Sequence, residues 1–277
     1  MTNSDSIKLA IQNIITTMMD RIMDNVTVKD PFIAEKHHAA KPLYAALVPD
    51  EIFKGSHFER RFVTPFGNVW EQLAVVTAEQ GLGSAKTQHL IYGTVKEERL
   101  KRIGEVLSNL EHSKKGESKI KPDWKSELSY ILEGDGEDIP VQVNCDLFVI
   151  DSKTNKRYAV EIKAPLPNSD QTKVSKEKLL KLFAMEPREI DFGYFALPYN
   201  PYGKKENYKW SFPARWFNMK EDEVVLIGSE FWDMLGGEGT YQSFISAVNE
   251  IGGEYKSRIY REFLGIEPPE SHENFTL

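Results

Sequence analysis

Hydrophobic residues recur at helical spacing in several separate segments of the chain. Apolar positions three or four residues apart predict an amphipathic helix over residues 7–26, and similar patterns predict helices over 68–79, 96–110, 124–132 and 173–185. Shorter helices are expected within 34–47. A helix that begins at Phe231 stops at the pair Gly236 and Gly237, and Thr240 then has the character of an N-cap for a final helix to about Phe263.

Four short segments have the composition of β-strands. Residues 141–150 and 156–162 are rich in branched apolar side chains, and the turn-forming segment 151–155 joins them as a hairpin. Residues 191–198 and 223–227 predict two further strands. The order of elements is helices, then β-β-α-β, then a strand and closing helices. This order predicts an α/β fold in which a mixed central β-sheet is flanked by helices.

The chain is expected to form a single domain over residues 1–277. Residues 1–135 are its mainly helical N-terminal part, 136–227 its sheet core and 228–277 its C-terminal helices. A polar segment with Gly and Pro, residues 112–123, predicts a loop before the sheet core.

Composition excludes several classes of protein. With 277 residues, 40% of them hydrophobic and 11% aromatic, the chain is globular. Its only cysteine is Cys145, which excludes disulfides and cysteine-rich zinc sites, and its six histidines show no metal-ligand spacing. No signal peptide and no apolar run of about 20 residues is present. We therefore expect a cytoplasmic protein that makes no use of a membrane.

Charge is distributed unevenly along the chain. The net charge of -7 argues against nonspecific coating of nucleic acid, which needs many cationic contacts to phosphate. Residues 221–277 hold 12 acidic and 3 basic side chains, whereas residues 204–220 hold 5 basic and 1 acidic, and 173–188 hold 5 basic and 2 acidic. A basic face outside the acidic tail is therefore compatible with the composition.

The predicted hairpin carries three charges on otherwise apolar strands. Glu161 and Lys163 are two residues apart and so point to the same side of their strand, and Asp146 on the neighbouring strand can lie opposite them. Two carboxylates at the end of a hairpin form a hard oxygen site suited to Mg²⁺. An adjacent lysine can position the metal-bound water or, as the neutral amine, deprotonate it, and as the ammonium it can stabilise the transition state of phosphodiester hydrolysis.

A structural ion pair is the competing interpretation of these charges. The pattern Glu-x-Lys occurs three times, and the pairs Glu117/Lys119 and Glu254/Lys256 need no more than solvation in a polar loop and on a helix. Only Glu161 and Lys163 lie on an apolar strand that follows another apolar strand with an aspartate. Burying unpaired charge there would cost several kcal/mol, which favours a functional site.

These residues resemble the PD-(D/E)xK nuclease signature, with Cys145 at the position where many members have proline. A closer resemblance is to the TdeIII/MjaII family of type II restriction endonucleases, and it covers most of the chain. It rests on four sequence blocks in order, of which the last is long and irregular: residues 58–64 (FERRFVT), 160–163 (VEIK), 197–202 (LPYNPY) and 228–241 (GSEFWDMLGGEGTY).

The resemblance implies a PD-(D/E)xK nuclease-like core with N- and C-terminal helical additions. It implies that Asp146 and Glu161 bind Mg²⁺ together with the backbone carbonyl of Ile162, and that Lys163 is catalytic. Many nucleases of this superfamily add a glutamate from a preceding helix, for which Glu71 is the candidate, with a solvated helix position as its alternative. The family's association with GGNCC-type sites suggests a related target.

Two basic segments are candidates for DNA contact. A helix behind the catalytic strand could follow a phosphate backbone, although the spacing of its lysines spreads them over more than one face. The loop after the third strand could also contact DNA, or could be only a solvated connector. The candidates are Gln171, Lys173, Lys176, Lys178 and Lys181 in the first segment and Tyr199, Asn200, Lys204, Lys205 and Arg215 in the second.

The sequence thus predicts a Mg²⁺-dependent type II restriction endonuclease that cleaves double-stranded DNA at a short palindromic site. A symmetric target calls for a homodimer. A site-specific nuclease also implies a companion DNA methyltransferase in the same system. Two alternatives use the same residues differently: a repair or recombination nuclease that acts on mismatches or junctions, and a non-catalytic DNA-binding protein.

Overall fold

The computed structural model describes residues 3–112 and 120–269. Most of the predicted loop at 112–123, including Glu117 and Lys119, and the last eight residues lie outside these ranges. The chain forms two compact units. The first, called the sheet unit, consists of residues 74–241 with the N-terminal residues up to 7. The second, called the helical unit, consists of residues 8–73 and 242–269.

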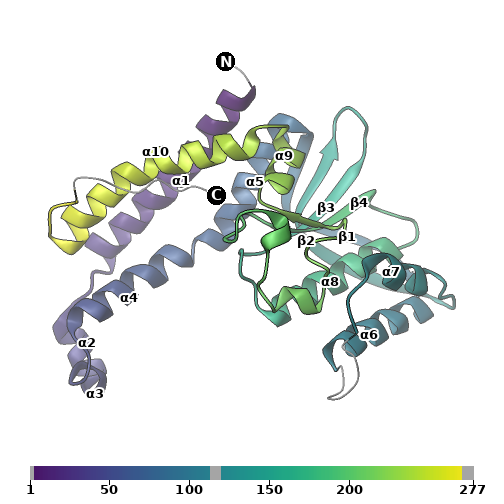
Figure 1. The fold of residues 1–277 in the computed structure, drawn as a ribbon, viewed down its shortest axis with the longest axis horizontal. Helices are drawn as coiled ribbons and strands as arrows, with labels where there is room; N and C mark the ends of the chain where they lie inside the picture. The colour runs from purple at the N-terminus through teal and green to yellow at the C-terminus, as the bar shows by residue number, and fades with distance from the viewer. Residues whose placement is uncertain (1–2, 113–119, 270–277) are drawn as a thin grey trace. The chain divides into compact units, whose positions relative to one another are not determined.

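Five strands in the order β1-β2-β3-β4-β5 form the sheet (Figure 1). They are β1 (Gly83–Lys96), β2 (Asp138–Asp151), β3 (Arg157–Ile162), β4 (Phe192–Leu197) and β5 (Val225–Ile227). β1 and β2 pair antiparallel, as do β2 and β3, whereas β3, β4 and β5 are parallel. The prediction of an α/β fold with a mixed central sheet is confirmed, and four of the strands lie where the apolar runs predict them.

The strand that the hydrophobic pattern did not predict is β1, which lies at one edge of the sheet. It pairs with β2 along nearly its whole length, from Gly83 opposite Asp151 to Lys96 opposite Asp138. Many of its side chains, including Lys86, Thr87 and Tyr92, are exposed. An edge strand with a solvated face does not need the apolar alternation by which strands are recognised, so its sequence resembles a polar connector.

The helices of the sheet unit surround this sheet (Figure 1). They are α6 (Glu97–Glu111), α7 (Trp124–Leu132), α8 (Ser169–Ala184) and α9 (Ser229–Gly236), together with the C-terminal half of α5 (Phe66–Gly81). The predicted helices over 96–110 and 124–132 match α6 and α7. α8 begins four residues before its apolar pattern because Asn168 and Gln171 form a reciprocal capping box.

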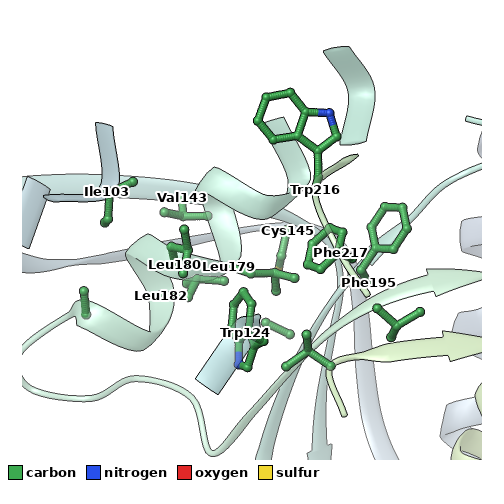
Figure 2. Packing of buried hydrophobic residues seen from close by; sticks show 14 of the residues in the cluster. Ile103, Trp124, Val143, Cys145, Leu179, Leu180, Leu182, Phe195, Trp216 and Phe217 are labelled. Carbon is green, nitrogen blue, oxygen red and sulfur yellow. The ribbon is translucent and has the colours of Figure 1, made fainter. Parts of the chain in front are cut away.

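One apolar cluster joins α6, α7 and α8 to the sheet (Figure 2). Leu179, Leu180 and Leu182 of α8 pack in it with Trp124 of α7 and with Cys145 of β2, and all five are buried. Phe195 of β4 stacks on Phe217 with ring centroids 4.8 Å apart. This packing fixes α8 against the sheet and so determines which of its polar side chains reach the strands.

The helical unit contains α1 (Asn3–Asp24, of which residues 8–24 belong to this unit), α2 (Ala34–Ala40), α3 (Pro42–Ala45), α4 (Asp50–Val63), the first half of α5 and α10 (Thr240–Arg258). Residues 25–29 and 259–264 continue α1 and α10 as π-helical turns. Ion pairs join α1 to α10: Lys8 lies 2.5 Å from Glu250, and Asp20 lies 2.8 Å from Arg258. No helix in the described ranges is long and apolar enough to cross a membrane.

Lys176 of α8 lies in the apolar cluster and not on the surface. Its side chain is 0% exposed, and Nζ lies 2.5 Å from the Glu127 carboxylate and donates to the backbone carbonyl of Trp216. Burial raises the pKa of Glu127 and lowers that of Lys176, so each charge depends on the other. The prediction that Lys176 contacts DNA is wrong, because its ammonium cannot reach a phosphate from this position.

Lys176→Met is expected to lower the free energy of unfolding by about 3 kcal/mol, because it leaves the Glu127 carboxylate buried without a partner. Replacing both partners, as Lys176→Met with Glu127→Leu, is expected to recover most of that loss. Urea denaturation followed by circular dichroism measures both effects. Equal stability of wild type and the single variant would contradict the buried pair.

Candidate active site

The ladder between β2 and β3 ends where the charged residues begin. Its last pair is Leu147 opposite Val160, so Asp146 and Glu161 are the first residues beyond it. The Asp146 carboxylate accepts a hydrogen bond of 2.8 Å from the backbone N–H of Ile162. This side chain thereby satisfies a backbone donor that the partner strand no longer reaches, and it is oriented toward β3.

Lys163 connects the two carboxylates, as the alternation of side chains along the strand predicts. Its Nζ lies 2.5 Å from Oδ2 of Asp146, 3.4 Å from Oε2 of Glu161 and 3.1 Å from the carbonyl oxygen of Ile162. The side chains of Lys163 and Asp146 are 19% and 11% exposed. The three residues of the predicted site therefore meet at one point that solvent still reaches.

Glu161 is the buried member of this site, with a side chain that is 0% exposed. Lys178 of α8 donates to both of its carboxylate oxygens, at 2.9 and 3.0 Å, and Ser175 Oγ lies 3.4 Å from Oε2. Lys178 is therefore part of the charged cluster, whereas the sequence suggested only a DNA contact for it. Two ammonium groups face two carboxylates, which balances the charge of the cluster.

Burial and charge shift the pKa values of this cluster in defined directions. Burial, reinforced by the neighbouring Asp146 carboxylate, raises the pKa of Glu161 despite its two lysine partners. Burial opposes the charge of Lys163, but the carboxylates of Glu161 and Asp146 outweigh it and raise the Lys163 pKa. Lys163 therefore remains an ammonium at neutral pH in the arrangement described, which suits it to hold and stabilise negative charge.

The donor set fits a Mg²⁺ ion. Oxygens of Asp146 and Ile162, with Glu161 Oε2 slightly farther away, converge on one cationic atom, Nζ of Lys163, so their arrangement already accommodates positive charge. Mg²⁺ is typically held by one or two carboxylates and completes its shell with water and phosphate oxygens. Within residues 3–112 and 120–269, no group of three or more His, Cys, Asp or Glu side chains forms a metal site of another kind.

Cys145 and Gln88 are neighbours of Asp146 in the sheet. Burial raises the pKa of the Cys145 thiol to about 12, so the thiol is neutral in the arrangement described. Gln88 of β1 lies across the ladder from Asp146, and these two residues are left out of the pairing between β1 and β2. Its φ of 48° is rare for a residue with a side chain, and such strain marks functional sites. No pattern in the sequence singles out Gln88.

The remaining α8 candidates already have partners within the protein. Lys173 lies 2.5 Å from Glu111 of α6, and Lys181 lies 2.6 Å from Glu177 one turn earlier. The Gln171 side chain accepts from the backbone N–H of Asn168 as part of the capping box. A DNA backbone would have to compete with these contacts, so α8 is a poorer phosphate-binding surface than its lysine content suggests.

The loop after β4 divides into structural and exposed residues. Asn200 is buried and closes the loop: its amide donates to the carbonyl of Lys204 and accepts from the N–H of Tyr202, so its predicted DNA contact is wrong. Lys205 lies 2.9 Å from Glu230 and donates to Val225, which ties the loop to β5 and α9. Tyr199 is half-buried. Lys204 and Arg215 are exposed and form no ion pair within the described residues.

Glu71, the candidate carboxylate from a preceding helix, lies on the half of α5 that belongs to the helical unit and is half-buried. Its catalytic role stays a prediction.

Comparison with known proteins identifies a family. The protein-family model described as "Type II restriction endonuclease, HinfI" matches residues 7–252 of the chain. Three similar proteins come from Herpetosiphon aurantiacus. The type II restriction enzyme HgiCII is 26% identical over 228 residues, which are 81% of this chain and 82% of the relative. HgiBI is 23% identical over 84% of this chain and 85% of its own, and HgiEI 24% over 81% of each.

Lys178→Met is expected to lower the free energy of unfolding by about 1–2 kcal/mol without metal, because it removes two charge-assisted hydrogen bonds from a buried carboxylate. Most of this loss should disappear in a Glu161→Gln background, as a double-mutant cycle by urea denaturation would measure. Lys181→Met is the matched control on the same helix, and its surface pair is expected to contribute at most about 0.5 kcal/mol. A Lys178 effect no larger than that of Lys181 would refute the pairing.

Proposed function

The chain belongs to the HinfI family of type II restriction endonucleases, and from this membership we propose that it hydrolyses double-stranded DNA with Mg²⁺ at a short palindromic sequence. Enzymes of this class cleave DNA and use a divalent metal ion. The observation that carries the proposal is the meeting of Asp146, Glu161 and Lys163 at the end of the β2-β3 ladder. Membership in the family favours this function over the repair-nuclease and non-catalytic alternatives.

Each residue of the site has a defined role in this proposal. The carboxylates of Asp146 and Glu161, with the carbonyl of Ile162, would hold Mg²⁺. The ion would supply a Lewis acid that acidifies water and neutralises charge on the scissile phosphate. The Lys163 ammonium donates hydrogen bonds to the phosphoryl oxygens and stabilises the charge that develops on them. Lys178 keeps Glu161 oriented from the side of α8.

The proposed reaction is an in-line displacement at phosphorus. A water oxygen forms the new bond to phosphorus and loses a proton, while the bond to the 3′-oxygen breaks and this oxygen takes up a proton. The products are a 5′-phosphate and a 3′-hydroxyl. We retain three residues of the sheet unit as DNA contacts: the exposed Lys204 and Arg215 and the half-buried Tyr199.

Finer features of the proposal come from the sequence. The resemblance to the TdeIII/MjaII family suggests a GGNCC-like target. Assignment of the site to the PD-(D/E)xK nuclease type also rests on sequence resemblance. A companion methyltransferase that protects the same site, and a cytoplasmic location, follow from the same function.

Purified protein with Mg²⁺ is expected to cut plasmid DNA into discrete bands, and run-off sequencing is expected to find one short symmetric sequence at every cut. Asp146→Ala and Lys163→Ala should each reduce the rate of cutting at least about 100-fold, because each removes a group that stabilises the transition state.

Asp170→Asn, an exposed charge change on α8, is the matched control and should cut at the wild-type rate. Cutting at the wild-type rate by either Asp146→Ala or Lys163→Ala would refute the assignment of these residues to the active site. Discrete bands are also the result that separates a site-specific enzyme from a mismatch or junction nuclease, which would leave plain plasmid uncut.

The active form is expected to be a homodimer, since a palindromic target presents two equivalent scissile phosphates related by a twofold axis. Sedimentation equilibrium with a duplex that contains the target should give two chains of 31.7 kDa for each DNA molecule. One chain per duplex at saturating protein would contradict this prediction.

A further inference from the structure

A basic cavity lies within the helical unit, between the segment that follows α1 and the helices α2 and α4. Its volume is about 370 Å³, and five of the side chains that line it are lysine or arginine: Lys29, Lys36, Lys41, Arg60 and Arg61. Among the described residues that line it, Asp30 is the only acidic one. In a chain whose net charge is -7, such a concentration of cations around one hollow needs an explanation.

Internal ion pairs account for only two of these cations. Arg61 donates to the Asp30 carboxylate from both Nε and Nη2, and Lys29 lies 2.6 Å from Asp24. Lys36, Lys41 and Arg60 are exposed, and none has an ion-pair partner among the residues that the structure describes. Three unpaired cations therefore line one cavity. The carboxylate of Asp30 in its described lining is already neutralised by Arg61, so the cavity is suitable for an anion.

Aromatic rings support the wall of the cavity. The His37 ring lies 4.1 Å from that of Phe53 and 5.6 Å from that of Phe32, measured between centroids. His57 packs on Phe32 at 5.9 Å and hydrogen-bonds the carbonyl of Asp30 at 2.7 Å. These contacts fix α2 and α4 against the segment between α1 and α2, so the cations they carry are held near one another before a ligand arrives.

A second hollow of about 610 Å³ shares Lys29 and Arg61 with the first. Its lining includes the side-chain amides of Asn13, Asn68 and Gln72 and the guanidinium of Arg21, together with apolar side chains such as Ile14 and Val69. Amides and guanidinium groups hydrogen-bond phosphate, sugar and base edges of nucleic acids. Because the two cavities share Lys29 and Arg61, cationic and amide groups extend over both of them. This arrangement fits an extended polyanion better than a small ion.

We propose that the cavity around Lys36, Lys41 and Arg60 binds a backbone phosphate of duplex DNA, so that the helical unit anchors the substrate. The inference rests on the proposed function, which supplies the polyanion. It differs from the sequence-based expectation, which assigned the DNA backbone to the lysines of α8. Those lysines have carboxylate or buried partners, whereas Lys36, Lys41 and Arg60 have no ion-pair partner among the described residues.

The test is fluorescence anisotropy of a target duplex and a duplex without the target, with Ca²⁺ in place of Mg²⁺, over a series of salt concentrations. Wild type is compared with Lys36→Gln, Arg60→Gln and the double variant, and Lys36→Arg tests whether charge alone suffices. Lys101→Gln on α6 is the matched control, since it removes one exposed charge elsewhere. Circular dichroism checks that each variant is folded.

The double variant is expected to bind both duplexes roughly tenfold more weakly, by the same factor for each, because phosphate contacts carry no sequence information. The slope of log K against log salt should become shallower by about one for each phosphate that the variant no longer neutralises. Lys36→Arg and Lys101→Gln should bind as wild type does.

Wild-type affinity and slope in the double variant would overturn the inference while leaving the proposed function intact, provided that the wild type cleaves plasmid. If the double variant no longer binds inorganic phosphate but binds the duplex with wild-type affinity, the cavity is a site for a small anion. That result would also overturn the inference. A wild type that neither binds nor cleaves duplex DNA would instead refute the proposed function and the inference with it.

Discussion

The burial of the Glu161 carboxylate is the constraint on which the candidate site depends. A fully buried carboxylate stays ionised only if hydrogen-bond donors or opposite charges compensate it. Lys163, the residue after the end of β3, supplies one, and Lys178 supplies another from α8. Because Lys163 also binds Asp146, the requirement to compensate one buried charge draws β2, β3 and α8 to a single point.

The same constraint explains why the site lies where the ladder ends. Inside the ladder, strand pairing would occupy the N–H of Ile162 and hold Asp146 to its neighbours on both sides. Beyond Leu147 and Val160 the strands separate, and the Asp146 side chain takes the N–H of Ile162 instead. Opposite Asp146, the unusual backbone of Gln88 interrupts the pairing with β1 as well. Loss of regular pairing is what leaves oxygen atoms there for a cation.

The periodicity of hydrophobic and polar residues predicted those features of the fold and site that depend on local sequence alone. The hairpin of β2 and β3, the helices α6 and α7, and the shared face of Glu161 and Lys163 all follow from the spacing of side chains along one element. β1 was not predicted, because an edge strand with an exposed face lacks apolar alternation. Lys178 and Gln88 were not assigned to the site, because their places depend on how separate elements pack, and that information is tertiary.

The lysines of α8 show how far a charge pattern can mislead about DNA contact. Four of the five basic residues over 173–188 are lysines of α8 and look like a phosphate-binding face. Packing instead places Lys176 in the core, Lys178 on Glu161, and Lys173 and Lys181 on surface carboxylates. A phosphate binds best to lysine and arginine side chains that have no carboxylate partner within the protein. By that criterion Lys36, Lys41 and Arg60 are stronger candidates than any lysine of α8, although none of them was predicted from the sequence to contact DNA.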